Sequence, residues 1–118
     1  MAVIHVSDDA LHFRLIAANI DNVVAAHIHL GGTDVNGPVV AHLFGPAAPG
    51  GGMSAGVLAT GTITVDDLTG PLDGQPLSVL IDAIEKFEAY GNVHTNDGVA
   101  PTNTGPGDFP GGEIRGQL

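Results

Sequence analysis

The sequence predicts an all-β fold: a Greek-key antiparallel β-sandwich or barrel of about seven short strands with one inserted helix. The chain has 118 residues, which suits one domain. Gly (18) and Pro (8) make up about a fifth of it and favour frequent turns. Aromatic residues are only 4% of the chain, so Val, Ile, Leu and Ala must fill the core between two packed sheets.

Three runs in the first quarter of the chain predict strands over residues 2–7, 10–18 and 23–30. A turn rich in Asn and Asp, at residues 19–22, separates the second run from the third. In the second strand, alternation places four apolar side chains on the core face: Leu11, Phe13, Leu15 and Ala17. In the third strand, alternation gives Val24, Ala26, Ile28 and Leu30 to the core and Val23, Ala25, His27 and His29 to the opposite face.

The rest of the chain predicts four more strands and one helix. Residues 39–44 form a strand that lies beside the third strand if the loop over 31–38 is a simple hairpin. A fifth strand over 55–65 is followed by a turn at 66–71 and by a helix with Pro76 at its first position. Five apolar residues of this helix recur at helical spacing: Leu77, Leu80, Ile81, Ile84 and Phe87.

The last strands are predicted over residues 89–95 and 113–118, and a loop rich in Gly and Pro joins them. If Val93 is in the core, alternation puts His94 on the outer face, as it does for His27 and His29. Ile114 and Leu118 are expected in the core. The loop over 96–112 is long enough to fold over a site on that outer face.

The run Ala25-Ala26-His27-Ile28-His29 is the densest chemical feature of the sequence. The two histidines share one face of a strand, about 6–7 Å apart along it, so their imidazoles can converge on one metal ion. A common alternative for a histidine is a place in the core with its hydrogen bonds formed. That alternative does not apply here, because both side chains face away from the predicted core. An outer polar face that simply carries two histidines remains the alternative.

Composition excludes several classes of function. The net charge is −10, and the only basic residues are Arg14, Lys86 and Arg115, so surfaces for nucleic acid or anionic membranes are not expected. The chain has no Cys, which excludes disulfides and thiolate metal sites. No run of 18 apolar residues predicts a membrane span, and the N-terminal residues have no signal-peptide pattern.

Several motifs resemble the CHRD (chordin) domain family. They are residues 25–29 with 36–40, residues 61–64 with 67–72, residues 92–95, and the ending Phe109-Pro110-Gly111-Gly112-Glu113-Ile114-Arg115-Gly116-Gln117-Leu118. In the family's order they cover nearly the whole chain, as one domain over residues 1–118. The resemblance implies an extracellular interaction role and favours a secreted or extracytoplasmic location.

A more distant resemblance is to copper–zinc superoxide dismutases, which bind copper on the outer face of a Greek-key barrel. A strand with His-x-His and a later Val-His before a long loop and a Gly-rich strand carry this resemblance. It implies a superoxide dismutase-like fold, with His27, His29 and His94 as metal ligands and Arg115 as the substrate-guiding arginine. The zinc-binding loop of that family has no counterpart between His29 and Pro38, so one copper ion per chain and no zinc site are expected.

The residue types agree with a copper site. Three imidazoles without a thiolate suit Cu, Zn or Ni, and Cu(II) has the highest affinity of these for a given site. Three protein ligands leave a coordination position open for a substrate. His42 is a candidate fourth ligand: if the loop over 31–38 is a simple hairpin, the strand register decides whether His42 lies near the His pair or faces the edge of the core. His5 and His12 are weaker candidates near the N-terminus.

Two functions remain open from the sequence. The first is a copper-dependent superoxide dismutase that converts superoxide to O2 and H2O2 by Cu(II)/Cu(I) cycling. The second is a non-catalytic module that stores or carries copper, or an extracellular interaction domain. The charge of −10 opposes attraction of an anionic substrate, which leaves Arg115, and less directly Arg14, to provide local positive charge. A monomer or a homodimer is expected.

Overall fold

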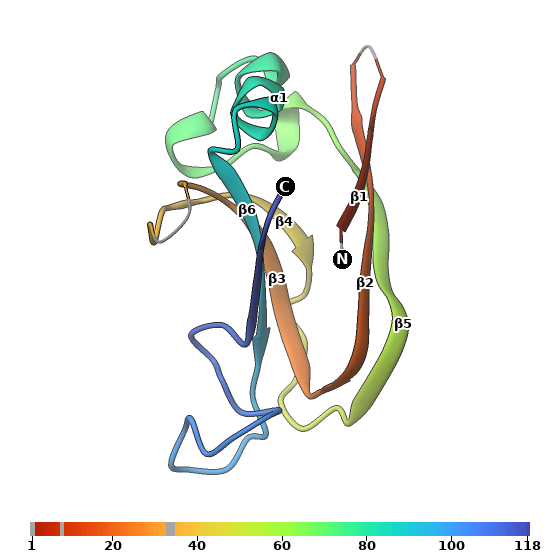
Figure 1. The fold of residues 1–118 in the computed structure, drawn as a ribbon, viewed down its shortest axis with the longest axis vertical. Helices are drawn as coiled ribbons and strands as arrows, with labels where there is room; N and C mark the ends of the chain where they lie inside the picture. Colours follow the sequence, from red (N-terminus) through yellow and green to blue (C-terminus); the bar gives the residue numbers. More distant parts are fainter. Residues whose placement is uncertain (1, 8, 33–34) are drawn as a thin grey trace.

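Two antiparallel sheets pack face to face in the computed structural model, which describes residues 2–7, 9–32 and 35–118 (Figure 1). One sheet has the order β1-β2-β5, with β1 at Ala2–Val6, β2 at Leu11–Asp21 and β5 at Met53–Ile63. The other has the order β4-β3-β6-β7, with β4 at Val39–Phe44, β3 at Val23–Leu30, β6 at Ala89–Thr95 and β7 at Ile114–Gln117. The predicted all-β sandwich of seven strands and one α-helix is confirmed for the described residues.

The connections between the strands cross from one sheet to the other. β2 leads into β3 in the opposite sheet, β3 and β4 pair as the predicted neighbours, and β5 returns to pair with β2. Around the sandwich the strand order is β2-β5-β4-β3, with β4 and β5 in contact at the edges of the two sheets and β2 beside β5, which is a Greek key. This topology puts β3 and β6 side by side in the centre of the four-stranded sheet.

The core lies between the two sheets and is aliphatic, as the composition requires. From β2, Leu11, Phe13, Leu15 and Ala17 are buried as predicted. Ala26 and Ile28 of β3 and Val93 of β6 face them from the other sheet. Because side chains alternate along a strand, burial of Ile28 and Val93 directs His27 and His94 to the outer face of the four-stranded sheet.

The ends of β3 depart from the predicted alternation. Val23 is buried and Val24 is only half-buried, which reverses the prediction for this pair. The pairing of β3 with β6 has a register shift between Val23 and Ala25, and an irregularity of this kind rotates the residue before it onto the other face. Leu30 is half-buried and packs against the core.

The strand bounds differ from the predicted ones where the chain bends. β2 continues through the predicted turn to Asp21, with Asn19 at φ 53° and a shifted register. β5 lies two residues earlier than predicted, because the chain after Ile63 turns into a 3-10 helix at Val65–Asp67. A second 3-10 helix follows at Gly70–Leu72.

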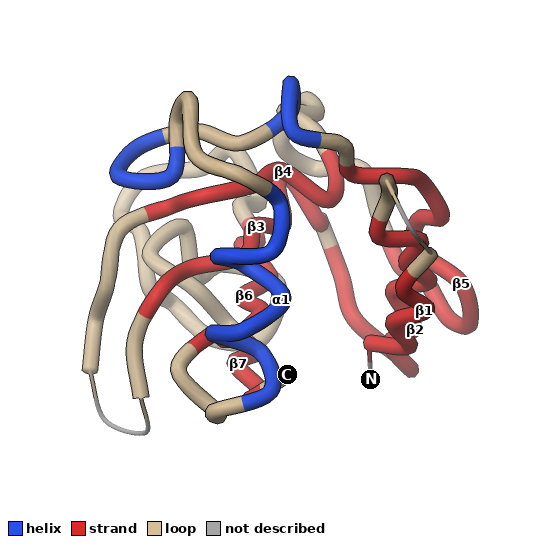
Figure 2. The backbone as a smooth tube through the Cα atoms, turned by 90° about the horizontal axis from the view of Figure 1, so that it is seen from above, coloured by secondary structure: helices blue, strands red, loops and turns tan. Residues whose placement is uncertain are grey.

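The α-helix α1 spans Leu77–Glu85 and lies at one end of the sandwich (Figure 1; Figure 2). Pro76 immediately precedes it, and Leu77, Leu80 and Ala83 are buried against the core. Phe87 is 69% exposed, so its predicted place in the core was wrong. The helix ends at Glu85, so the apolar face of the helix does not include Phe87. Phe87 adopts φ 59° where the chain turns into β6. No helix of the described residues is long and apolar enough to cross a membrane.

The edge strand β7 is exposed along its whole length. Ile114 is 42% exposed, which contradicts its predicted core position, whereas Leu118 packs against the core as predicted. Ile114 lines an open groove of about 350 Å³ between β2 and β7. The two sheets do not close on each other at this edge, and β7 therefore leaves its apolar residue partly in solvent.

Candidate metal centre

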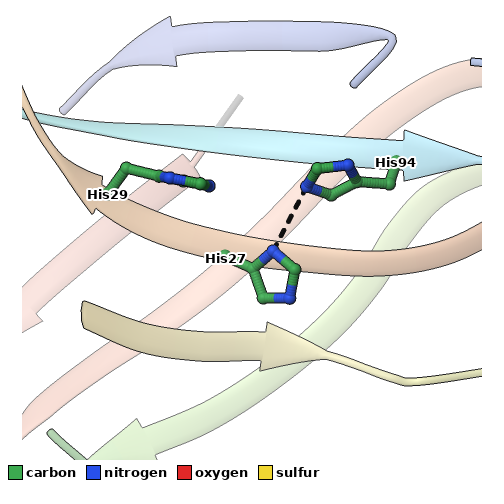
Figure 3. Close-up of side chains that lie close together, drawn as sticks. All are labelled: His27, His29 and His94. Atoms are coloured by element: carbon green, nitrogen blue, oxygen red, sulfur yellow. Dashed lines mark hydrogen bonds between the residues drawn. The ribbon is translucent and has the colours of Figure 1, made fainter. Parts of the chain in front are cut away.

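Three histidines from the two central strands meet on the outer face of the four-stranded sheet (Figure 3). His27 and His29 come from β3 and His94 from β6, where the register pairs His94 with Ala25 and places Asn92 opposite His27. Each histidine offers one ring nitrogen, and these three nitrogens all lie within 4.8 Å of one another. Among the described residues, no other group of three His, Asp or Glu side chains converges in this way. The structure therefore brings together the three residues predicted as metal ligands.

Backbone carbonyls determine which nitrogen of two of these rings carries the proton. His29 Nδ1 lies 2.9 Å from the carbonyl oxygen of Gly37, and His94 Nδ1 lies 2.8 Å from that of Pro110. Because a carbonyl can only accept, each Nδ1–H donates and each Nε2 keeps its lone pair. His94 Nε2 lies 3.2 Å from His27 Nδ1. Both Nε2 atoms therefore keep a lone pair: that of His29 is unpaired, and that of His94 accepts a hydrogen bond from His27 Nδ1–H.

The Nε2 atom of His29 is buried and has no hydrogen-bond partner among the described residues. The whole side chain of His29 is only 8% exposed. Buried polar atoms are normally paired, and an unpaired one indicates a bound partner from outside the chain or a functional role. A metal ion bound between the three rings would satisfy this nitrogen, so the three residues fit a metal ion.

His27 stays neutral at physiological pH. Burial is the first cause that lowers the pKa of His27 to about 4, and the neighbouring histidines His94, His42 and His29 lower it further by charge repulsion. A neutral imidazole is the form that binds a metal ion. The clustering of imidazoles thus prepares His27 as a ligand before any ion is present.

His42, the candidate fourth ligand, lies on β4 directly opposite His27. Its ring stands edge-on to that of His27, with the ring centroids 4.9 Å apart and the planes at 84°. His42 is exposed and lies outside the group of three nitrogens that converge. A fourth coordination bond from His42 stays a prediction.

Tyr90 was missed by the sequence analysis. Its ring stacks on that of His29, with the centroids 4.9 Å apart and the planes at 5°, and its hydroxyl oxygen accepts a 3.0 Å hydrogen bond from the Gly37 amide. Gly37 also accepts the His29 proton, so one loop residue connects the two rings. Alternation along β6 could have predicted its position, because Tyr90 lies four residues before His94 and therefore shares its face of the strand.

Arg115 lies next to this stack, on β7. Its guanidinium carbon is 3.5 Å from the centroid of the Tyr90 ring. Its Nη2 donates a 2.7 Å hydrogen bond to the carbonyl of Gly32, and its Nη1 a 3.3 Å bond to Oδ1 of Asn36. The predicted substrate-guiding arginine is thus engaged with the ring of Tyr90 and with the loop between β3 and β4.

The long loop between β6 and β7 is held against the sheet by part-buried hydrogen bonds. Oε1 of Glu113 accepts hydrogen bonds from Thr95 Oγ1 at 2.9 Å and from the Gly107 amide at 2.6 Å. Thr95 in turn accepts a 2.9 Å bond from the Phe109 amide, next to Pro110. The loop, which the sequence showed only to be long enough to reach the site, contacts it through the Pro110 carbonyl at His94.

Asp108 makes this loop sensitive to acid. Hydrogen bonds from the hydroxyl and the amide of Thr104 to Asp108 Oδ2, 2.7 and 3.0 Å long, hold the pKa of this buried carboxyl below its ordinary value of 3.8. Because the pKa is lower in the folded state, the carboxylate stabilises the fold above the unfolded value. That contribution is lost as the pH falls through the folded value.

The stability difference between the native chain and Asp108→Asn is therefore expected to be constant near neutral pH and to shrink below about pH 4. Urea unfolding of both proteins between about pH 7 and about pH 3 measures this difference, and the titration of all other groups cancels in it. A difference that does not change down to about pH 3 contradicts the assigned hydrogen bonds.

The two N-terminal histidines belong to the other sheet. His5 and His12 face each other across β1 and β2, with their ring centroids 6.4 Å apart. His12 Nδ1 lies 3.0 Å from Oγ1 of Thr62 on β5. The strand β2 does not neighbour β3 in a sheet, so neither His12 nor Arg14 reaches the three-histidine site.

Comparison with known proteins gives one match. The model of the CHRD domain family matches residues 1–118. The chain belongs to the CHRD domain family. No curated protein and no solved structure matches it, and the more distant resemblance to copper–zinc superoxide dismutases receives no support from these comparisons. This CHRD domain is a β-sandwich that presents a cluster of three histidines on one outer face.

Proposed function

We propose that this CHRD domain binds one copper ion through His27, His29 and His94 and catalyses the dismutation of superoxide. The observation that carries the proposal is the buried, unpartnered Nε2 of His29, which lies with two further imidazole nitrogens inside a 4.8 Å cluster. The donor set supports copper, since Cu(II) has the highest affinity for imidazole sites among the common divalent metals.

The chain's own residues supply the features that a dismutase site needs. The carbonyls of Gly37 and Pro110 fix the tautomers of His29 and His94. Burial, and after it the neighbouring histidines, lower the pKa of His27 and keep it neutral. His27 and His94 are only half-buried, so a small anion can reach the centre from solvent. Bound copper supplies one-electron cycling between Cu(II) and Cu(I), by which two superoxide ions and two protons become O2 and H2O2.

A copper titration of the metal-free protein tests the binding step. We expect one Cu(II) per chain, with nitrogen couplings in the EPR spectrum that correspond to bound imidazoles. Binding with no nitrogen couplings, or no stoichiometric binding, contradicts the proposal.

A superoxide assay of the copper-loaded protein tests the catalytic step. We expect turnover with copper and none with Zn(II) in the same site, because Zn(II) has no redox chemistry. Stoichiometric copper without turnover identifies a non-catalytic copper carrier, the second function that the sequence leaves open.

A further inference from the structure

We propose that Arg115 is a positioning residue that holds His29 ready for the metal, acting through Tyr90 and the loop between β3 and β4. This inference rests on the proposed function, because it assigns the metal-binding nitrogen of His29. It gives Arg115 a role different from guidance of an anionic substrate.

The first step of the argument is the hydrogen bonding of the loop. The planar guanidinium of Arg115 donates from two nitrogens, to the carbonyl of Gly32 and to Oδ1 of Asn36. A fork of donors can hold two acceptors at fixed positions, which a lysine ammonium cannot do with the same geometry. Arg115 therefore holds the loop in place at Asn36. The next residue along the chain, Gly37, accepts the hydrogen bond from His29.

The second step is the stack of side chains. The strand order β3-β6-β7 places His29, Tyr90 and Arg115 on three successive strands. The guanidinium carbon lies 3.5 Å from the Tyr90 centroid, and the Tyr90 ring is parallel to His29 within 5°. A guanidinium over an aromatic face is attracted by the ring quadrupole. Arg115 thus holds Tyr90 against His29, and Tyr90 lies between the charge and the histidine.

The two steps converge on one proton. The His29 Nδ1–H needs the Gly37 carbonyl as its acceptor, and the Tyr90 hydroxyl holds the amide of the same residue. If the loop is released, Nδ1 loses its acceptor, and the proton can move to Nε2, which is the nitrogen that must carry a lone pair for the metal. Groups that orient a metal-binding histidine in this way typically contribute 10–100-fold to metal affinity.

Three variants separate positioning from charge. Arg115→Lys keeps the positive charge and removes the planar fork, and Arg115→Gln removes both. Arg14→Gln is the matched control, since it removes one positive charge from the exposed outer face of β2, away from the site. Circular dichroism and thermal unfolding check that every variant is folded.

Nitrogen-15 NMR of the metal-free proteins reads the tautomer of His29 directly. We expect the native protein and Arg14→Gln to have the proton on Nδ1, and both Arg115 variants to populate the Nε2–H form. We also expect both Arg115 variants to bind Cu(II) about tenfold more weakly, with Arg14→Gln unchanged. A native tautomer and native affinity in Arg115→Lys overturn the proposal and favour a charge effect.

The tautomer measurement does not depend on the proposed function. If the native protein binds no copper but Arg115→Lys still shifts the His29 proton, positioning stands and the metal assignment fails. If copper binds and no Arg115 variant changes the tautomer, the metal assignment stands and positioning fails.

Discussion

Replacing His27 with alanine is expected to weaken Cu(II) binding by more than about a hundredfold, beyond the typical effect of an outer-shell change. His27 is central to the cluster: its Nδ1 lies 3.2 Å from His94 Nε2, and its ring centroid lies 5.8 Å from that of His29. Without it, two imidazoles on neighbouring strands remain, and the ion loses one of its three protein ligands. A competition titration against a copper chelator measures the change.

The fold of His27→Ala should survive. His27 is half-buried on the outer face, and its side chain is not part of the aliphatic core between the sheets. We expect the metal-free variant to unfold within about 0.5 kcal/mol of the native chain, as for most surface substitutions.

The matched control is His12→Ala, which removes an exposed histidine from the outer face of the other sheet. Its copper affinity should equal that of the native chain. Equal losses in His12→Ala and His27→Ala would place the copper outside the three-histidine cluster. His42→Ala, measured in the same series, tests the candidate fourth ligand, because only a coordinating His42 would change the nitrogen couplings.

Alternation along strands explains why much of the site could be predicted. The spacing of His27 and His29 puts both rings on one face, and the burial of Val93 puts His94 on the same face of the neighbouring strand. That β3 and β6 are neighbours does not follow from alternation. It depends on the order of strands in the sheet, which the sequence pattern alone does not determine.

Irregular backbone accounts for the predictions that were wrong. A register shift puts Val23 rather than Val24 in the core, and the end of α1 leaves Phe87 in solvent although its spacing is helical. Alternation along the strand assigns Ile114 to the core face, but Ile114 lies on an edge strand where the two sheets diverge. Periodicity predicts which side chains share a face, but not whether another layer covers that face.

The groups that orient the ligands could not be predicted, because they are backbone carbonyls of loops. Gly37 and Pro110 contact His29 and His94 through atoms that every residue has. No side-chain pattern marks such positions, and only the folded loops bring them to the rings. The glycine at position 37 nevertheless has a steric signature that leads to the second strong prediction.

Gly37→Ala is expected to disrupt the loop between β3 and β4 and, with it, the support of His29. A Cβ atom on Gly37 would overlap the carbonyl oxygen and carbon of Leu30, both of them backbone atoms that cannot turn aside. The Leu30 amide also donates a 3.1 Å hydrogen bond to the Pro38 carbonyl, so the two sides of the loop are held together at this point. The loop must move away from β3 to admit the methyl group.

This movement separates the Gly37 carbonyl from His29 and the Gly37 amide from Tyr90, since both bonds come from the same residue. We expect a loss of about 1–3 kcal/mol in the free energy of unfolding, as for other overpacked sites. Copper affinity should fall by up to about a hundredfold, more than in the Arg115 variants, because the acceptor itself is displaced. Urea unfolding and the chelator competition measure the two effects.

Gly51→Ala is the matched control, because a Cβ on this exposed loop glycine meets no other atom within 4 Å. It should leave both stability and copper affinity unchanged. If Gly37→Ala lowers stability but keeps native copper affinity and the native His29 tautomer, the Gly37 carbonyl is only a structural contact. The orientation of His29 would then come from the stacked ring of Tyr90, and the same measurements on Tyr90→Leu, which removes the stack and the hydroxyl, would show the loss instead.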